Sequence, residues 1–294
     1  MNIQPIPLDS LKLVKMLQRK PAEHKGDAGK VVLIGGAPGM AGALLLAGNA
    51  CLHLGAGWTI LEMLDPASAR ADQNQPELMI RLASTDIKEM LEITQPDVIA
   101  IGPGLGKSEL TSKYLYEVLS TTKNPLVIDA DALNLISESD DLLACLIQRN
   151  KIAPAHSVIT PHPGEAAKLL KISTDAVQTN RLDAIDKLVE LTQSIVVLKG
   201  QHTLIASPTH PPVQCLAGNP GMGTGGMGDV LTGSIAAIAA QGLRHQLDLW
   251  QATSIAVELH ASAADSLVGK GVGPIGLTPS ETILEMRSLL NKLL

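Results

Sequence analysis

The sequence predicts a three-layer α/β/α sandwich with a mostly parallel central sheet. Short apolar segments alternate with helical patterns along nearly all of the 294 residues, which is the order typical of α/β proteins. Several apolar segments are unbroken runs of Val, Ile and Leu, as in parallel strands buried on both faces. The lack of Phe and an aromatic content of 1% predict an aliphatic core. We expect one domain, 1–294.

Each expected strand is a short apolar run that stops near a glycine, proline or acidic residue. In chain order the strands are expected at residues 30–34, 58–62, 97–101, 126–129, 157–159, 195–198 and 203–206. Longer helical patterns cover residues 41–54, 108–121, 163–170, 175–193, 229–241, 247–268 and 280–294. Residues 1–23 are expected as an N-terminal helical extension. The proline-rich segment 207–221 is expected to be a loop and not a domain boundary.

The composition argues against nucleic-acid and membrane partners. The net charge is −6, the pI is about 5.7, and no run rich in Lys and Arg occurs. Residues 43–61 carry no Asp, Glu, Lys or Arg, but Asn49 and His53 favour a buried helix and strand over a membrane span. The cysteines, Cys51, Cys145 and Cys215, are far apart and suit free thiols in a reducing compartment. With no apolar signal-peptide region at the N-terminus, we expect a cytoplasmic protein.

Glycines and polar residues cluster directly after the expected strands. The carboxyl ends of parallel strands share one edge of a sheet, where ligands of α/β proteins bind. These loops therefore predict a single extended site. They are Gly35-Gly36, Gly102-Pro103-Gly104-Leu105-Gly106, Asp129-Ala130-Asp131, the segment from Thr160 to Glu165, and Lys199-Gly200.

Residues 218–229 form a glycine-dense loop that leads into an apolar helix opened by Asp229. Glycines let backbone N–H groups converge on one point, and the helix N-terminus adds a positive partial charge, so the loop predicts an anion site. The expected donors are the N–H groups of Gly225, Gly226, Met227 and Gly228. The helix dipole is expected to lower the pKa of Asp229, leaving a carboxylate that could accept a hydroxyl proton during phosphoryl transfer. The plain alternative is that Asp229 only caps the helix.

Two familiar motifs are approximated but not met. The loop before Lys107 and Ser108 resembles a Walker A motif, but the first glycine of that motif would fall on Ile101. The spacing Gly223-x-Gly225-x-x-Gly228 matches a dinucleotide fingerprint, but no strand precedes it. Neither a P-loop nor a Rossmann dehydrogenase is expected.

Two further segments have a structural interpretation beside a functional one. Lys199, Gly200, Gln201, His202 and Thr203 join two short strands, so they form either a plain hairpin turn or a nucleotide contact. In the segment from Thr160 to Glu165, His162 lies between two prolines. Glu165 could hold Mg²⁺ directly or through water. The histidines show no zinc-binding spacing.

Taken together, these motifs resemble those of the ribokinase-like superfamily and, within it, the ADP/ATP-dependent NAD(P)H-hydrate dehydratases. The resemblance runs from about residue 24 to the C-terminus. It is carried by residues 24–30, 35–43 and 100–106, by Asp129 to Asn134, by Thr160 to Glu165, by Lys199-Gly200, and by residues 218–229.

The resemblance implies an activity and a set of site residues. The enzyme would use ADP or ATP, with Mg²⁺, to dehydrate the hydrated (S)-epimer of NADH or NADPH, releasing AMP and phosphate from ADP. Asp229 would remove the proton of the ring hydroxyl as it attacks the terminal phosphoryl group. The hydrate-binding positions would be Ala43, Gly106, His162 and Asp229. The nucleotide-binding positions would be Lys199, Gly200, Gln201, His202, Thr203 and Gly228.

The same resemblance implies a homotetramer. Members of the family are often fused to an NAD(P)H-hydrate epimerase domain, for which this chain has no room. We therefore expect the epimerase as a separate protein and pathway partner, or as a part missing from this sequence. ADP is favoured over ATP. Two alternatives stay open: a kinase of the same superfamily acting on a vitamin alcohol, and a nucleotide-binding scaffold without activity.

Overall fold

The computed structural model describes residues 5–294, and its ten strands form one sheet in the order β1-β10-β9-β8-β7-β6-β5-β2-β3-β4. All neighbouring strands in this sheet are parallel except the two pairs that β9 makes with β8 and β10. The strands are β1 (Ile6–Pro7), β2 (Lys30–Gly35), β3 (Trp58–Met63), β4 (Met79–Leu82), β5 (Val98–Ile101), β6 (Leu126–Ile128), β7 (Ser157–Ile159), β8 (Ile195–Leu198), β9 (Leu204–Ser207) and β10 (His210–Gln214).

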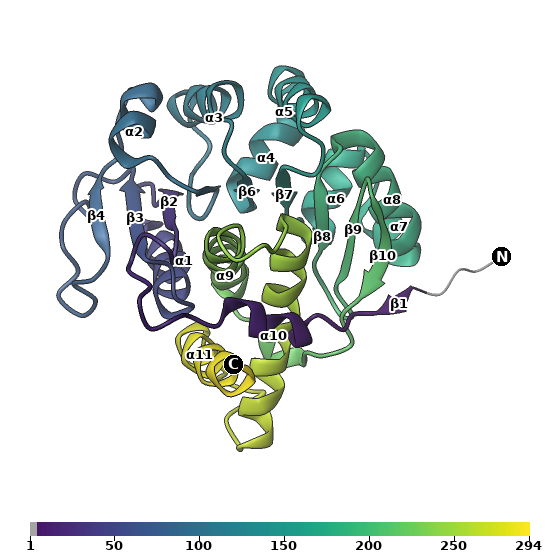
Figure 1. Cartoon of the computed structure of the whole chain (residues 1–294). Helices are drawn as coiled ribbons and strands as arrows, with labels where there is room; N and C mark the ends of the chain where they lie inside the picture. The colour runs from purple at the N-terminus through teal and green to yellow at the C-terminus, as the bar shows by residue number, and fades with distance from the viewer. Residues whose placement is uncertain (1–4) are drawn as a thin grey trace.

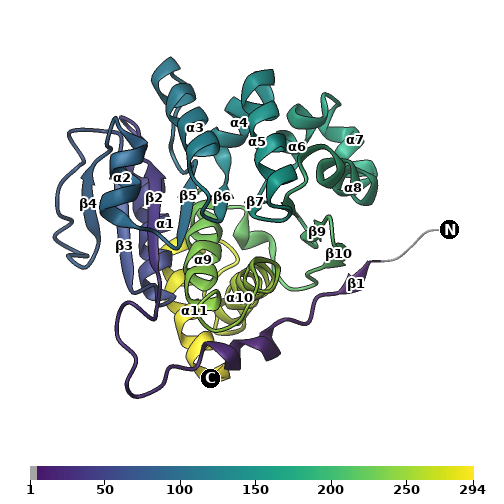
Figure 2. The ribbon, with the colours of Figure 1, turned by 45° about the horizontal axis from the view of Figure 1, so that its top comes forward.

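Helices cover both faces of the sheet (Figure 1). One layer holds α1 (Ala41–His53), α9 (Met227–Gly242), α10 (Leu249–Gly269) and α11 (Pro279–Leu293). The other holds α2 (Ile87–Thr94), α3 (Glu109–Thr121), α4 (Ala130–Glu138), α5 (Asp140–Ile152), α6 (Pro163–Leu170), α7 (Thr174–Thr179) and α8 (Arg181–Thr192). The tilted view separates the two layers (Figure 2). Two 3-10 helices, η1 (Leu11–Leu17) and η2 (Pro220–Met222), complete the elements of residues 5–294.

The central strands are mostly apolar because each face of the sheet has its own core. In β2, Val31 and Leu33 pack with α1 and α9, whereas Val32 and Ile34 pack with the opposite helices. Successive side chains of a strand point to opposite faces, so a strand covered on both sides favours apolar residues at successive positions. The predicted three-layer sandwich with a mostly parallel sheet is confirmed.

The expected strands agree with β2, β3, β5, β6, β7, β8 and β9 to within one residue. The expected loop 207–221 was wrong, because it contains β10. Pro211 and Pro212 lie where the β10–β9 register is irregular, between His210 and Val213. Proline cannot donate to a ladder, so it is tolerated at such an irregularity. The strands β1 and β4 and the helices α2, α4 and α5 were not predicted.

The helical pattern 175–193 was wrong as a single helix. It divides into α7 and α8 at Asn180, whose side chain accepts a hydrogen bond from the Asp183 N–H and starts the second helix. The helix expected at 229–241 begins two residues earlier, at Met227. Other expected helix ends shift by at most two residues.

The N-terminal segment crosses the helical layer of α10 and α11. The Glu258 carboxylate on α10 accepts hydrogen bonds from the Ser10 N–H, the Ser10 hydroxyl and the Leu11 N–H, which fixes the start of η1. Part of the expected extension, residues 1–4, lies outside the described residues. The assignment of 1–294 to one domain stays a prediction.

The uncharged stretch 43–61 forms most of α1 and the start of β3. None of the helices in residues 5–294 has both the length and the apolar character needed to cross a bilayer.

Helices α1 and α9 touch through a glycine, and this contact gives a stability prediction. A methyl group on Gly233 would overlap the backbone carbonyl of Ala47. Gly233→Ala is therefore expected to force the helices apart and lower the free energy of unfolding by about 1–3 kcal/mol in urea denaturation. Gly269→Ala is the matched control, since nothing lies within 4 Å of its added methyl group. Its effect should be below about 1 kcal/mol; equal losses in both variants would contradict the close-contact argument.

Candidate active site

The loops after β2 and β5 interlock at the carboxyl edge of the sheet. The Gly36 N–H donates to the Pro103 carbonyl over 3.0 Å, and the Ala37 N–H donates to the Gly104 carbonyl over 2.7 Å. A side chain on Gly104 would meet Met40 and Ala43 at the start of α1. These contacts place Ala43 beside the 102–106 loop, on one wall of the site.

Asp131 connects this wall to the end of β6. Its Oδ2 accepts a hydrogen bond from the Gly106 N–H over 2.9 Å. Ala130, just before it, has a φ of 48°, in the left-handed region. This strained turn directs two carboxylates, Asp129 and Asp131, from one short segment toward the site.

A buried ion pair forms the centre of the site. Lys199 Nζ, at the end of β8, lies 2.8 Å from Asp129 Oδ1, and the Thr232 hydroxyl of α9 donates to Asp129 Oδ2 over 2.8 Å. The Asp129 side chain is 1% exposed and that of Lys199 is 20% exposed. Burial favours the neutral form of Asp129, but Lys199 outweighs it and lowers the pKa of this carboxyl. Burial likewise opposes the charge on Lys199, but Asp129 and Glu165 outweigh it and raise the lysine pKa.

Glu165 and His162 lie beside this pair at the start of α6. Glu165 Oε2 accepts a hydrogen bond from the His162 N–H over 2.8 Å and lies 4.0 Å from Lys199 Nζ. Burial raises the pKa of Glu165 to about 7 although Lys199 opposes the shift. Burial and Lys199 lower the pKa of His162, so its ring is neutral at pH 7.

The loop 218–228, called the anion loop below, ends in the first turn of α9. In the part of the chain that the structure describes, no side chain caps this helix at Gly226, which has a φ of 96°. Its first N–H groups are therefore available to a ligand. The Met227 N–H is an exception, because it donates to the Thr224 carbonyl over 3.3 Å. Of the four residues predicted as anion donors, Gly225, Gly226 and Gly228 are the better placed.

Gly228 lets the anion loop approach the buried ion pair. A methyl group on Gly228 would lie 3.3 Å from Lys199 Nζ and 3.6 Å from Asp129 Oδ2. The helix N-terminus and the lysine ammonium thus meet at one place, and both favour an anion.

The expected low pKa of Asp229 was wrong. Burial and the nearby Asp129 raise the pKa of Asp229 to about 7, although Lys199 opposes the shift. Loss of hydration and repulsion between carboxylates therefore outweigh the helix dipole. A carboxylate with a pKa near the working pH is a better general base than a surface aspartate, so this direction is compatible with the predicted proton-acceptor role of Asp229, which stays a prediction.

Two of the predicted nucleotide residues face a further cavity of about 1050 Å³ between the β8–β9 turn and the α7–α8 junction. Gln201 and His202 line this cavity with Arg181, whose guanidinium donates to the backbone carbonyls of Leu198 and Lys199. Thr203 closes the turn by donating from its hydroxyl to the Gly200 carbonyl over 3.1 Å.

A sequence profile described as NAD(P)H-hydrate dehydratase matches residues 31–283. The chain belongs to the NAD(P)H-hydrate dehydratase family. It is 41% identical over 270 residues to the bifunctional NAD(P)H-hydrate repair enzyme Nnr of Coxiella burnetii, covering 91% of this chain and 51% of that relative. It is 38% identical over 276 residues to the enzyme of the same name from Escherichia coli, covering 93% and 50%. The chain thus spans about half the length of these relatives.

Solved structures agree with this family and with the ribokinase-like fold. An ADP/ATP-dependent NAD(P)H-hydrate dehydratase from Bacillus subtilis, co-crystallized with ATP/Mg²⁺, aligns with a TM-score of 0.79 and 25% identity over 100% of both chains. A ribokinase-like superfamily protein from Enterococcus faecalis aligns with a TM-score of 0.76 and 28% identity, over 100% of this chain and 98% of that one. The resemblance stated from the sequence is confirmed at the level of family and fold.

The magnesium prediction for Glu165 finds no cluster of metal-ligating side chains around it among the described residues. Residues 5–294 contain no group of three or more His, Cys, Asp or Glu side chains arranged to hold a metal. Asp129 already accepts from Lys199 and Thr232, and Glu165 accepts from His162. Direct ligation of Mg²⁺ by Glu165 stays a prediction without a supporting cluster.

The importance of two residues in this site was not recognised from the sequence. Asp129 was noted only as part of a strand-end motif, although it pairs with Lys199. Thr232 was not singled out, because a hydroxyl inside an apolar helix usually bonds to its own backbone. Its position one turn after Gly228 on α9 is the pattern that could have revealed it.

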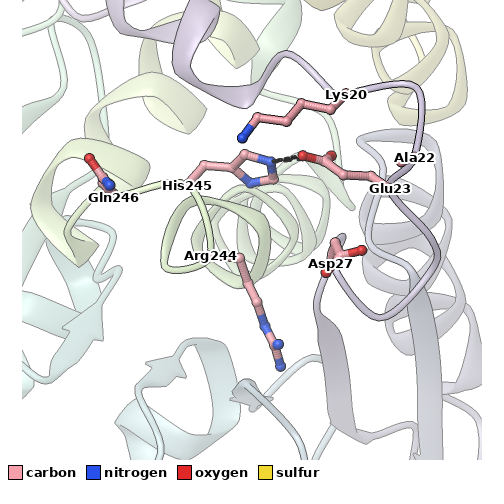
Figure 3. Close-up of a pocket in the computed structure, with 7 residues that line it drawn as sticks. All are labelled: Lys20, Ala22, Glu23, Asp27, Arg244, His245 and Gln246. Carbon is pink, nitrogen blue, oxygen red and sulfur yellow. Dashed lines mark hydrogen bonds and ion pairs between the residues drawn. The ribbon is translucent and has the colours of Figure 1, made fainter.

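A second cavity, of about 520 Å³, is lined mainly by ionisable side chains (Figure 3). It includes Arg244 and His245, just past the end of α9, and Glu23, which contacts the His245 ring. Because α9 has 16 residues, this cavity lies about 24 Å from the anion loop. It is therefore separate from the polar cluster around Asp129 and Lys199.

Proposed function

We propose that this chain catalyses the nucleotide-dependent dehydration of the (S)-epimer of hydrated NADH or NADPH, and so acts as a carbon–oxygen lyase in nicotinamide nucleotide repair. The observation that carries the proposal is Asp229. This carboxyl, with a pKa of about 7, opens a helix whose N-terminus meets the Lys199 ammonium. A general base and an anion site are adjacent, as phosphoryl transfer to a hydroxyl requires. The family match spans the whole of this site.

The reaction divides into transfer and elimination. Asp229 takes the proton of the ring hydroxyl while the hydroxyl oxygen forms a bond to the terminal phosphorus of ADP or ATP, and the nucleotide leaves with one phosphate fewer. The ring nitrogen then donates its lone pair as the carbon–oxygen bond breaks and phosphate departs. Loss of a proton from the neighbouring carbon restores the dihydropyridine. Phosphorylation thus converts a poor leaving group into a good one.

The chain's own residues supply binding and charge. The N–H groups of Gly225, Gly226 and Gly228, with Lys199, would hold the transferring phosphoryl oxygens, a preorganised arrangement that favours the transition state. The Gly228 position also allows close approach of the nucleotide. With ADP the products would be AMP and phosphate. Mg²⁺ would enter as the companion of the nucleotide phosphates and keep most of its own water ligands.

The hydrate would lie on the wall of the site opposite the anion loop. Ala43 and Gly106, together with His162 from the loop after β7, would contact the nicotinamide ring as it approaches Asp229. The Nδ1 atom of His162 accepts from the Gly164 N–H over 3.0 Å, so the neutral ring could donate a hydrogen bond from Nε2 without repelling Lys199. Gln201, His202 and Thr203 would contact the nucleotide from the β8–β9 turn, after Lys199 and Gly200.

The partners proposed for this activity follow from its chemistry. The enzyme would act on one epimer, so a separate NAD(P)H-hydrate epimerase would supply the (S)-form. The bifunctional names of the relatives support a link between the two steps. A cytoplasmic homotetramer is the state we propose for the chain.

The test is to incubate the protein with Mg²⁺, hydrated NADH and either ADP or ATP. We expect recovery of the near-ultraviolet absorbance of NADH, with one phosphate released per NADH formed. A stable phosphorylated product from a vitamin alcohol, without NADH recovery, would instead favour the kinase alternative. Nucleotide binding without any turnover would favour the scaffold.

A further inference from the structure

Asp265, on α10, holds the start of the anion loop although it lies outside the polar cluster of the site. Its Oδ2 accepts a hydrogen bond from the Gly218 N–H over 2.8 Å, and its Oδ1 accepts one from the Asn219 side-chain amide over 2.9 Å. Two bonds from one carboxylate to adjacent residues fix both the position and the direction of the loop. Asp265 is exposed, so its charge needs no hydrogen-bond partners to compensate for lost hydration.

From Asn219 a chain of hydrogen bonds continues through the anion loop. Asn219 Oδ1 accepts from the Gly221 N–H over 3.0 Å, and the Gly221 carbonyl accepts from the Thr224 hydroxyl over 3.0 Å. The Thr224 carbonyl then accepts from the Met227 N–H over 3.3 Å. The chain therefore links α10 to the first residue of α9, two positions before Asp229.

Such a connection matters because the anion loop is rich in glycine. Glycine loses more conformational freedom on ordering than any other residue, and Gly218 itself has a φ of 109°. An unanchored loop of this composition would sample many arrangements of its N–H groups. Phosphoryl transfer depends on the correct alignment of donors and base.

We propose that Asp265 is a positioning residue for the reaction, acting through Asn219 and Thr224 to hold the anion loop and Asp229 in register. The inference rests on the proposed function. If Asp265 acted only through its negative charge, replacing it would have a different effect. A carboxylate near a phosphate site repels the ligand, so its removal alone would strengthen nucleotide binding.

The test compares Asp265→Ala and Asp265→Asn with wild type. The Ala variant is expected to lower kcat about 10–100-fold, the scale of a small misalignment, with little change in the nucleotide KM. The Asn variant keeps one acceptor and should recover part of the loss. Hydrogen–deuterium exchange of the Gly221 and Met227 amides should accelerate in the Ala variant, and this measurement needs no substrate.

Glu285→Gln is the matched control. Glu285 also accepts two hydrogen bonds at the end of α10, from the Ser266 hydroxyl and the Lys270 ammonium, but it does not touch the anion loop. The Glu285→Gln variant should leave kcat and the hydrogen–deuterium exchange of the Gly221 and Met227 amides unchanged. Thr224→Val should lower kcat, and combined with Asp265→Ala it should add little, because both break one chain.

Three results would overturn the proposal. They are tighter nucleotide binding with unchanged kcat in Asp265→Ala, an equal loss of kcat in Glu285→Gln, and unchanged exchange of the Gly221 and Met227 amides. If wild type fails to dehydrate the hydrate, the proposed function fails, while the exchange measurement still decides whether Asp265 orders the loop.

Discussion

Replacing Asp229 with Asn is expected to lower kcat by about 10²–10⁴-fold, the usual contribution of a positioned general base, while nucleotide affinity is retained. The amide keeps the size and polarity of the carboxylate but cannot accept the hydroxyl proton. The anion loop and Lys199, which would bind the phosphates, are untouched. The measurements are steady-state turnover of hydrated NADH and nucleotide binding by calorimetry. Full activity in the Asn variant would remove Asp229 from the mechanism.

The wild-type pH profile gives a second measure of Asp229. Its pKa of about 7 means that the basic form increases as pH rises through neutrality, so kcat/KM should fall on the acid side of pH 7. Glu165 also has a pKa of about 7, so Glu165→Gln is the control. The acid limb should persist in Glu165→Gln. Its loss there would assign the titration to Glu165.

As pH rises toward and through neutrality, the contribution of Asp229 to the free energy of unfolding should decrease, whereas activity should increase. The pKa of Asp229 in the folded chain, about 7, lies above the ordinary value of 3.8. The folded state therefore binds the proton more tightly, and this group's contribution to stability is lost as pH rises from the lower value to the higher one. The Asn variant should lack that loss. Its greater resistance to urea above pH 7 would exclude misfolding as the cause of inactivity.

The sequence predicted the buried parts of the fold better than its edges. The strands β5 and β8 are unbroken apolar runs because both of their faces are covered, and such runs can be recognised without a structure. The prolines of β10 concealed a strand, because local proline chemistry suggests a loop and only the partner strand β9 shows otherwise. Edge strands depend on distant pairing, which no local pattern records.

The site likewise has features that the local sequence predicts and features that depend on tertiary structure. The anion loop was predictable because its glycines are adjacent in the chain. The pairing of Asp129 with Lys199 was not, since 70 positions separate them and only the order of strands in the sheet brings them together. The pKa of Asp229 was predicted in the wrong direction, because the helix dipole is a local effect, whereas burial and the charge on Asp129 come from tertiary structure.

Lys199→Met is expected to affect both stability and activity. Asp129 is 1% exposed, so the variant leaves a buried carboxylate without its cation, which costs about 3–5 kcal/mol of folding free energy when one partner of a buried pair is removed. The nucleotide KM should also rise, because the ammonium beside Gly228 is lost. Urea denaturation at pH 7 measures the first effect and nucleotide titration measures the second. Unfolding equal to that of wild type would mean that the pair is not buried in solution.

The double variant Asp129→Asn with Lys199→Met separates the two effects. Without a buried charge, it should be more stable than Lys199→Met alone, because the neutral amide still accepts from Thr232 and has no charge to desolvate. Its nucleotide affinity should stay low, since nothing replaces the ammonium. Asp129→Asn alone should cost less than Lys199→Met, because Glu165 lies 4.0 Å from Lys199 Nζ and still faces the cation. If the double variant also regained nucleotide affinity, the role of Lys199 would be to neutralise Asp129, and the anion would be held by the α9 N-terminus alone.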